Sequence, residues 1–151
     1  MGKAALELEY AVERQLDKIT RQLDSRGTRV TNELMNAKNE VLRGQRSGRR
    51  YRVPNTGAYY TASAPGEPPA QRTGNFRKRW DRKAFSTGTS RSREVHSQIE
   101  SSVRTAGGKY VLGQILEEGT PGGKIAPRPY KEKIVEKAKP KIVKIYKEPY
   151  L

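Results

Sequence analysis

The chain has 151 residues, a formal net charge of +15 at pH 7 and no cysteine. Its length predicts one domain over residues 1–151, and the missing cysteines exclude disulfides and thiolate metal sites. No apolar run approaches the roughly 18 residues that a membrane span needs, and the first residues lack the apolar segment of a signal peptide. We therefore expect a soluble protein, made in the cytoplasm, that has no membrane partner.

The apolar content is low for a folded domain. Leu, Ile, Val and Phe account for 27 of the 151 residues, about 18%, which is near the composition of disordered chains. The net charge is unevenly distributed along the chain: it is 0 over residues 1–42, +11 over residues 43–93 and +4 over residues 94–151. This pattern favours a chain that completes its fold against neighbours and a basic middle segment that meets a polyanion or an acidic protein surface. A solvated basic loop without a specific partner is the alternative.

Residues 3–43 are predicted to form one long helix, because apolar residues recur at steps of three and four. Ser25-Arg26-Gly27 interrupts this stripe, so we expect a kink or a split there. A small domain can hardly cover so long a stripe alone, and we therefore favour packing against a neighbouring subunit. The alternative is an amphipathic helix that packs on its own domain. The candidate subunit-interface residues are Leu8, Val12, Ile19, Leu23, Leu34 and Val41.

Residues 44–74 are predicted to form a basic hairpin followed by a Pro-rich loop. Short strands over 49–53 and 58–63 flank the turn signal Pro54-Asn55-Thr56-Gly57. The stretch 64–74 reads as an extended connector.

Residues 75–128 are predicted to hold a sheet and short helices. Thr73 is the expected N-cap of a helix over 75–80. Two strands over 81–104 should join near residues 86–90, and in the second one Val95, Ile99 and Val103 should share a face. Apolar residues over 109–118 predict a short buried helix.

Residues 129–151 close the chain with a helix over 129–147. One side carries Tyr130, Ile134, Ala138, Ile142 and Ile145, and Pro140 should kink or split the helix. The expected fold class is α+β: a long N-terminal helix, a small antiparallel β-sheet with a hairpin, short helices and a C-terminal helix.

Catalytic chemistry has little support in this sequence. His96 is the only histidine, so a catalytic triad or a His-rich metal site lacks its partners. The segment Gly119–Lys124 is shorter than a phosphate-binding loop and is followed by Ile125 where such loops have Ser or Thr. We expect no enzyme, no cofactor and no metal site.

Basic and aromatic residues alternate in the middle of the chain, a pattern that suits nucleic-acid backbones and protein interfaces equally well. No motif for sequence-specific recognition is present. The candidate DNA-channel or partner-facing basic residues are Arg49, Arg50, Arg52, Arg72, Arg77, Lys78 and Arg79.

Two stretches resemble one known family. Pro65-Gly66-Glu67-Pro68-Pro69, followed by Thr73-Gly74-Asn75-Phe76-Arg77, is similar to a Pro-rich segment that ends in Thr-Gly-x-Leu-Arg. Glu118-Gly119-Thr120, followed by Ala126-Pro127-Arg128-Pro129-Tyr130, is similar to its closing segment. The family is that of small tail-component proteins of long-tailed bacteriophages, named after gene product ten of a lambdoid phage. Phe76 stands where Leu is usual, and Pro127 to Tyr130 replace the common Arg-Pro-Phe.

The resemblance implies a virion component at the head–tail junction (a neck, connector or tail-completion protein), made in the host cytoplasm. Such proteins form homo-oligomeric rings, with six-fold symmetry favoured and twelve-fold possible, between adaptor or portal proteins and the tail tube or its terminator. Genomic double-stranded DNA passes through the ring. The motif residues expected to be structural are Thr73, Gly74, Glu118, Gly119, Thr120, Pro127 and Pro129, with Gly74 and Gly119 as candidates for positive φ.

Two alternatives stay open. One is another minor head or tail assembly protein of a phage. The other is a nucleic-acid-binding protein without sequence preference, whose affinity would fall steeply with salt.

Overall fold

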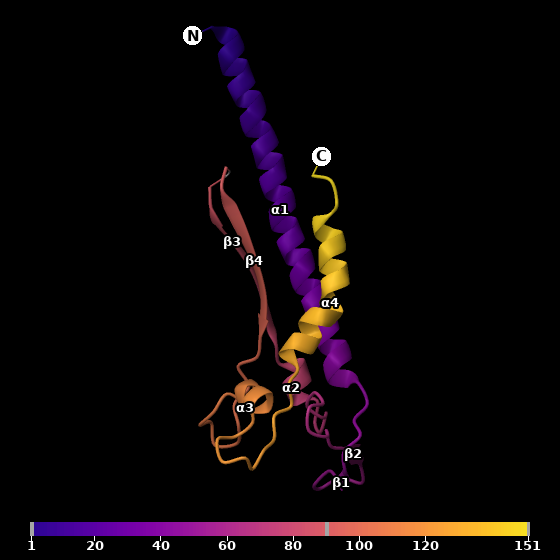
Figure 1. The fold of residues 1–151 in the computed structure, drawn as a ribbon. Coiled ribbons are helices and arrows are strands. Elements are labelled where there is room, and N and C mark those ends of the chain that lie inside the picture. The colour runs from indigo at the N-terminus through magenta and orange to yellow at the C-terminus, as the bar shows by residue number, and fades with distance from the viewer. Residues whose placement is uncertain (1, 90, 151) are drawn as a thin grey trace.

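A single straight helix, α1 (Lys3–Arg43), forms the axis of the molecule in the computed structural model, which describes residues 2–89 and 91–150 (Figure 1). The predicted bounds of this helix are confirmed. The predicted kink or split at Ser25-Arg26-Gly27 is wrong, because the helix runs through all three residues. Gly27 instead creates the space in which a strand approaches the helix: a Cβ there would lie 2.4 Å from Cγ1 of Val95.

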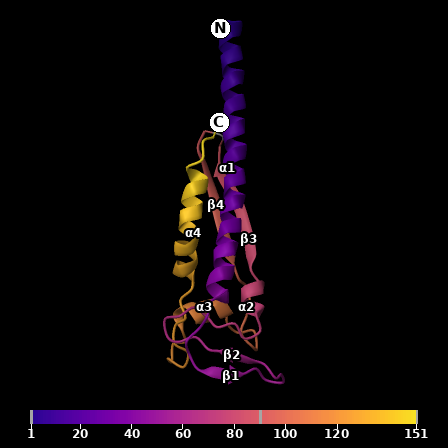
Figure 2. The same cartoon turned by 90° about the vertical axis from the view of Figure 1, so that its right-hand side faces the viewer.

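The expected α+β fold class is confirmed, and its antiparallel strands form two separate two-stranded hairpins. β1 (Arg50–Arg52) pairs with β2 (Tyr59–Thr61), and β3 (Asp81–Gly88) pairs with β4 (Arg93–Glu100). The β3–β4 hairpin lies along α1, whereas β1–β2 lies at the end opposite the N-terminus (Figures 1 and 2).

Half-buried and exposed residues alternate along β4, as its sequence predicts. Val95 and Ile99 face α1, and His96 faces away. The strand ends at Glu100, so Val103 lies beyond it. The turn falls after Gly88, later than expected, and its Ser90 lies outside the described residues.

Three further helices complete the chain: α2 (Asn75–Lys78), α3 (Leu112–Glu118) and α4 (Lys131–Tyr146). The first two are shorter than predicted, and α3 buries only its Gly113. α4 continues through Pro140 without splitting. It packs antiparallel to the second half of α1, where Lys137 and Lys141 form ion pairs with glutamates of α1.

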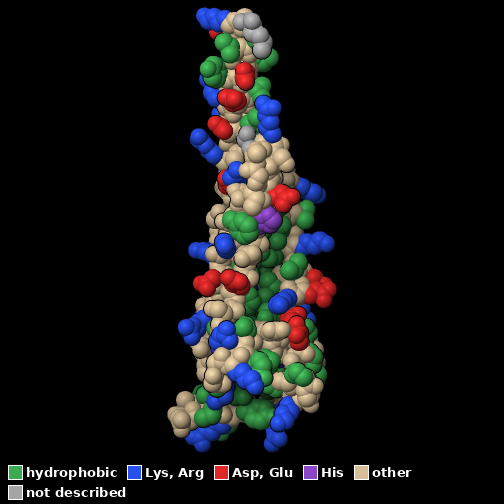
Figure 3. All heavy atoms as spheres, turned by 90° about the vertical axis from the view of Figure 1, so that its left-hand side faces the viewer, with side chains coloured by type: hydrophobic (Ala, Val, Ile, Leu, Met, Phe, Trp, Pro, Cys, Tyr) green, Lys and Arg blue, Asp and Glu red, His purple; other side chains and the backbone are tan. Residues whose placement is uncertain are grey.

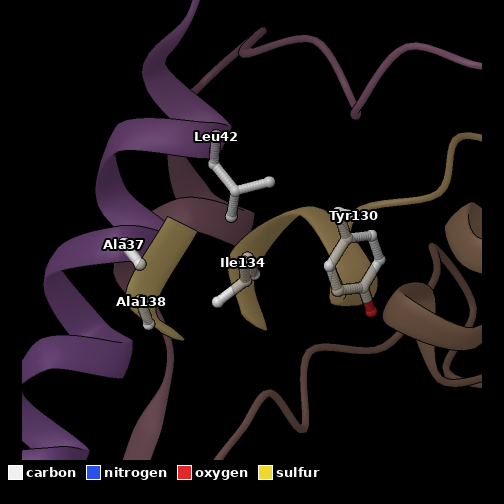
Figure 4. Packing of buried hydrophobic residues seen from close by; sticks show 5 residues of the cluster. All are labelled: Ala37, Leu42, Tyr130, Ile134 and Ala138. Atoms are coloured by element: carbon white, nitrogen blue, oxygen red, sulfur yellow. The ribbon is translucent and has the colours of Figure 1, made fainter. Parts of the chain in front are cut away.

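The core lies between α1 and α4, near the end of the molecule that carries the β1–β2 hairpin, here called the hairpin end. Its buried centre consists of Ala37, Leu42, Tyr130, Ile134 and Ala138; Ala37, Leu42, Ile134 and Ala138 lie between the two helices, and Tyr130, directly before α4, lies beside them and points toward α3 (Figure 4). Alanines at 37 and 138 let the two backbones approach closely. The apolar side of the C-terminal helix predicted from the sequence is confirmed at Tyr130, Ile134, Ala138 and Ile145.

The molecule is elongated and exposes a large surface. Its accessible surface is 10751 Å², whereas a compact monomer of 17.0 kDa exposes about 7,700 Å². The N-terminal part of α1 projects alone beyond the other elements (Figures 1 and 3). None of the helices within the described residues is both long and apolar enough to cross a membrane.

Candidate partner and nucleic-acid interface

The β1–β2 hairpin presents an exposed array of arginine and tyrosine side chains. Tyr51 pairs with Tyr60 across the strands, and their rings stack with centroids 5.9 Å apart. The guanidinium of Arg50 lies 4.7 Å from the ring centroid of Tyr59, and that of Arg49 lies 5.7 Å from the ring centroid of Tyr51. Isolated two-stranded hairpins are marginal in water, so these cross-strand contacts give the tip its order.

The hairpin turn is held by its own polar groups. Arg52 donates from Nε to the carbonyl of Thr56 at 3.0 Å, and Asn55 adopts a positive φ of 60°. At the other end, Gly48 donates its N–H to the carbonyl of Ala62 at 2.8 Å. The ladder therefore extends beyond the two short strands and resembles the longer strands that the sequence predicted.

Arg46 fixes the base of the hairpin to the end of α1. Its guanidinium donates to the carbonyls of Val41 at 2.8 Å, Gly44 at 2.7 Å and Pro69 at 3.1 Å. Partial burial lowers the pKa of Arg46. This arginine belongs to the basic block of the sequence, yet its contacts are internal to the chain.

Glu67 closes the Pro-rich connector onto the start of the hairpin. Its carboxylate accepts hydrogen bonds from the Ser47 hydroxyl, the Ser47 N–H at 3.1 Å and the Ala64 N–H at 2.9 Å. The Ser47 hydroxyl and these two N–H groups lower the pKa of Glu67 to about 2. These hydrogen bonds hold the connector against the start of the β1–β2 hairpin, so the connector is a pinned segment that positions this hairpin.

The Thr-Gly pair of the first motif starts α2, but in a different way than predicted. Gly74, with a φ of 77°, is the N-cap residue, so the expected positive φ is confirmed and Thr73 is not the N-cap. Thr73 Oγ1 still accepts the N–H of Asn75 at 3.3 Å. The backbone at position 74 is left-handed, a conformation that glycine adopts without strain and that residues with a side chain disfavour.

Phe76, which follows this pair, belongs to a cluster of three aromatic rings. Phe76, Trp80 and Tyr130 contact one another edge-to-face, with centroids 5.5 to 5.9 Å apart. The Trp80 indole donates to the carbonyl of Phe76 at 2.7 Å, and the Tyr130 hydroxyl donates to the carbonyl of Gly113 at 3.0 Å. The cluster joins α2, α3 and α4, so the first motif is part of the packing.

Lys38 lies beneath this cluster and was not singled out in the sequence. It is only 2% exposed and donates to the Arg77 carbonyl at 2.7 Å and to Asn39 at 2.8 Å. Its ammonium lies 5.8 Å from the ring centroid of Trp80. Burial, and then the nearby charge of Arg77, lowers the pKa of Lys38.

The second motif forms a closed loop after α3. Gly119 is buried and has a φ of 76°, as expected, and a Cβ there would lie 2.6 Å from the Ile125 carbonyl. Thr120 donates its N–H to that carbonyl at 3.0 Å and accepts the Ile125 N–H on its hydroxyl at 3.0 Å. Glu118 is exposed at the rim of an open groove.

Glu117, rather than Glu118, carries the structural role in this segment. Its carboxylate accepts the N–H groups of Tyr130 at 2.8 Å and Lys131 at 3.3 Å, which lie at the start of α4. A carboxylate at this position favours the helix N-terminus. Burial, and then the charge of Glu117, raises the pKa of Tyr130 to about 12.

The two motif segments, far apart in the sequence, lie side by side. Gly66 donates its N–H to the Pro127 carbonyl at 3.5 Å, and Lys133 donates to the Gly66 carbonyl at 2.8 Å. Arg128 donates to the Ser63 hydroxyl at 2.8 Å. Pro127 is exposed at this junction. Both motifs therefore build one structural unit at the hairpin end, which also holds the half-buried Pro129.

The candidate basic residues gather at this same end. Arg49, Arg50 and Arg52 lie on or beside β1, Arg72 lies in the connector, and Arg77, Lys78 and Arg79 lie in or directly after α2. All except the half-buried Arg77 are exposed. An open cavity of about 470 Å³ is lined by Lys78 and Arg79 together with Arg104, which the sequence did not single out because it follows a different strand.

The candidate interface stripe of α1 divides into two parts. Leu34 and Val41 pack against the core of the same chain, and Ile19 and Leu23 are half-buried. Leu8 and Val12 are 67% and 46% exposed. The unpartnered part of the stripe is therefore its N-terminal end.

The geometry defines an elongated α+β protein with a basic, tyrosine-rich tip at one end and a bare helix at the other. Among residues 2–89 and 91–150, no three His, Cys, Asp or Glu side chains gather where they could hold a metal ion. No protein-family model, curated protein or solved structure matches this chain.

Proposed function

We propose that this chain is a structural virion protein of a long-tailed bacteriophage, which forms a ring at the head–tail junction and lets DNA pass. The observation that carries the proposal is the junction of the two motif segments. Gly66 of the first motif segment donates its N–H to the carbonyl of Pro127 in the second, and beside this contact Arg128 bonds Ser63 and Lys133 bonds Gly66. Segments that form one structural unit of a family are expected to pack together, as these two do.

Two further observations support this role. The surface is about 3,000 Å² larger than that of a compact monomer of this mass, which is typical of a subunit whose faces are covered in an assembly. The basic residues of the tip are exposed, and they would face either the phosphates of passing DNA or the acidic surface of an adjacent ring.

Electron microscopy of a lysate from a phage with this gene disrupted tests the proposal. We expect separate heads and tails, or heads that leak DNA, because the junction would be incomplete. Intact, joined particles would refute the joining role. Expression of the gene from a plasmid should restore joined particles and would exclude an effect on neighbouring genes.

Nucleic-acid binding without sequence preference is the second candidate, favoured by the arginines that lie over tyrosine rings on the hairpin. Replacing Arg49, Arg50 and Arg52 by Glu should then abolish binding of a DNA duplex, whose log affinity falls with log salt. The triple change of Lys3, Arg14 and Lys18 to Glu, far from the tip, has the same charge effect and serves as the control. Equal loss in both variants would show a general charge effect and no site at the tip.

A further inference from the structure

Residues 3–15 of α1, here called the extension, belong to the part of the helix that projects beyond the other elements (Figures 1 and 2). Every one of these residues is exposed, and they span about 20 Å of helix. Four large apolar side chains are bare: Leu6, Leu8, Tyr10 and Val12, at 51%, 67%, 63% and 46% exposure. A helix of this length is marginal in water without packing, and clustered exposed apolar residues mark an interaction surface.

α4 carries a second exposed apolar surface, here called the shoulder, whose Val135 lines an open groove together with Leu34 and Ile99. Val135, Val143 and Tyr146 are 54%, 40% and 39% exposed. Val135, Lys139 and Val143 follow at steps of four residues and form one ridge. Ile134 and Ala138 of the same helix face the core. The shoulder is therefore a separate apolar surface that does not contribute to this core.

The two surfaces carry opposite charge. The extension holds two basic and three acidic residues, a net charge of −1, which leaves +16 for the rest of the chain. Glu9 and Glu13 each follow one of the apolar residues Leu8 and Val12. α4 has six lysines and two glutamates, and Lys139 lies within the ridge of the shoulder.

The extension and the shoulder cannot meet within one chain. The Arg26 guanidinium donates to the Tyr146 carbonyl at 3.3 Å, so α4 ends beside Arg26 and does not reach residues 3–15 (Figures 1 and 2). A contact between them therefore joins two copies through different surfaces. Repetition of such a contact closes into a ring or grows into a filament.

We propose that the extension of each copy packs Leu8 and Val12 on the Val135–Val143 ridge of the next copy. The proposal rests on the proposed function, which takes this chain to form a ring. It adds the two surfaces in contact and their head-to-tail arrangement.

Engineered cysteines test the contact directly, because the chain has none of its own. Val12→Cys and Val143→Cys are co-expressed as two distinguishable chains and oxidised. We expect at least tenfold more disulfide-linked dimer of unlike chains than of either chain alone. Dimers of Val12→Cys alone at the same yield would show that extensions pair with each other, and no cross-link of unlike chains would equally overturn the proposal.

A charge-matched pair of variants tests the apolar contribution. The double variant Leu8→Glu/Val12→Glu and the single variant Arg14→Glu both change the net charge by −2, but Arg14 lies on the opposite side of the helix. Analytical ultracentrifugation should show the double variant as a monomer and Arg14→Glu in the wild-type oligomer. An oligomeric double variant, or a monomeric wild type at all concentrations, would refute the contact.

The two proposals can fail separately. If disruption of the gene blocks head–tail joining while the cross-link is absent, the joining role stands and this contact is wrong. If the cross-link forms while disrupted phages assemble normally, the contact stands and the joining role is wrong.

Discussion

Ser25-Arg26-Gly27, the break in the apolar stripe of α1, is the place where two other elements attach. Ser97 of β4 donates its hydroxyl to the Gly27 carbonyl at 2.8 Å. On the other side, Arg26 is 4% exposed, and its guanidinium lies 3.7 Å from the ring centroid of Tyr150. The polar and small residues that interrupt the stripe therefore serve the tertiary structure while the helix stays continuous.

Gly27→Ala should destabilise the protein although alanine favours helices. The gain in helix propensity is about 1 kcal/mol, whereas forcing a Cβ to within 2.4 Å of Val95 is an overpacking that costs about 1–3 kcal/mol. Urea unfolding should show a lower midpoint, and Val95→Ala in the same chain should recover part of the loss. Gly122→Ala, which meets no atom within 4 Å, is the control. A more stable Gly27→Ala variant would contradict the close approach of β4.

Arg26→Met should destabilise the chain by about 2–4 kcal/mol, because it keeps the apolar stem and removes a buried charged donor. The carbonyls of Glu148 and Pro149, at 2.6 and 3.0 Å, would lose their partner. Amide hydrogen exchange over residues 145–150 should become faster. Arg29→Met is the control: it removes an exposed ion pair with the same Glu148 and should change the urea midpoint little. Equal effects of the two changes would refute the buried role of Arg26.

Glu67 makes the connector sensitive to acid. Its folded-state pKa of about 2 lies below the usual 4.5, so the stability from this carboxylate is complete above pH about 4.5 and is lost as the pH falls toward about 2. An NMR titration of the Glu67 carboxyl should show a midpoint near 2. Ser47→Ala should raise this midpoint toward 4.5, because the Ser47 hydroxyl is the largest cause of the shift. A wild-type midpoint near 4.5 would show that the connector is not pinned.

At the scale of elements, α4 tolerates an exposed proline in its interior. Proline removes one backbone hydrogen bond and crowds the preceding turn. Pro140→Ala should therefore stabilise the protein by about 1–3 kcal/mol, which exceeds the roughly 0.4–1 kcal/mol lost through a freer unfolded chain. Thermal unfolding should show a higher Tm, and Lys144→Ala, an exposed change on the side of α4 opposite Val135, is the control. A lower Tm would mean that the fold depends on the altered backbone at Pro140.

The elements with strong periodicity were the ones predicted best. The step pattern of three and four fixed α1 at residues 3–43, and the alternation around Val95 and Ile99 identified β4. The two hairpins were not predicted to be separate. No local sequence pattern indicates that Arg46 and Glu67 hold the β1–β2 hairpin at the end of α1, away from β3–β4. Glu117 was missed as the cap of α4 for the same reason: its partners lie thirteen and fourteen residues onward.

The candidate site was predicted only in part, because charge alone does not distinguish internal from external arginines. Arg46 and Arg93 belong to the basic block but bond to carbonyls at the hairpin base and to Asp24, respectively. Arg49, Arg50 and Arg52 are exposed as expected. Arg104 lines the same cavity as Lys78 and Arg79 because the folded chain brings these distant residues together. The sequence therefore predicted that one end of the molecule is basic, and the structure shows which basic side chains are exposed there.

At the scale of the whole molecule, the two ends have opposite character. The N-terminal end is a bare helix with a net charge of −1 over residues 3–15, and the other end carries the arginine-rich hairpin. A small core between them, close to α2 and α3, has five buried members. Both ends expose side chains that this core does not cover, which would suit the proposed role of a subunit that binds a neighbour at each end.

Removal of residues 2–15 separates folding from assembly. These residues are all exposed, so the truncated chain should have the Tm of the wild type at high dilution. If the extension packs on the next copy, the Tm of the wild type should rise with protein concentration, because association stabilises the folded state by mass action. The truncated chain should lose this dependence, and Arg14→Glu should keep it. A wild-type Tm that is independent of concentration, or an equal dependence in the truncated chain, would show that the extension serves some other partner.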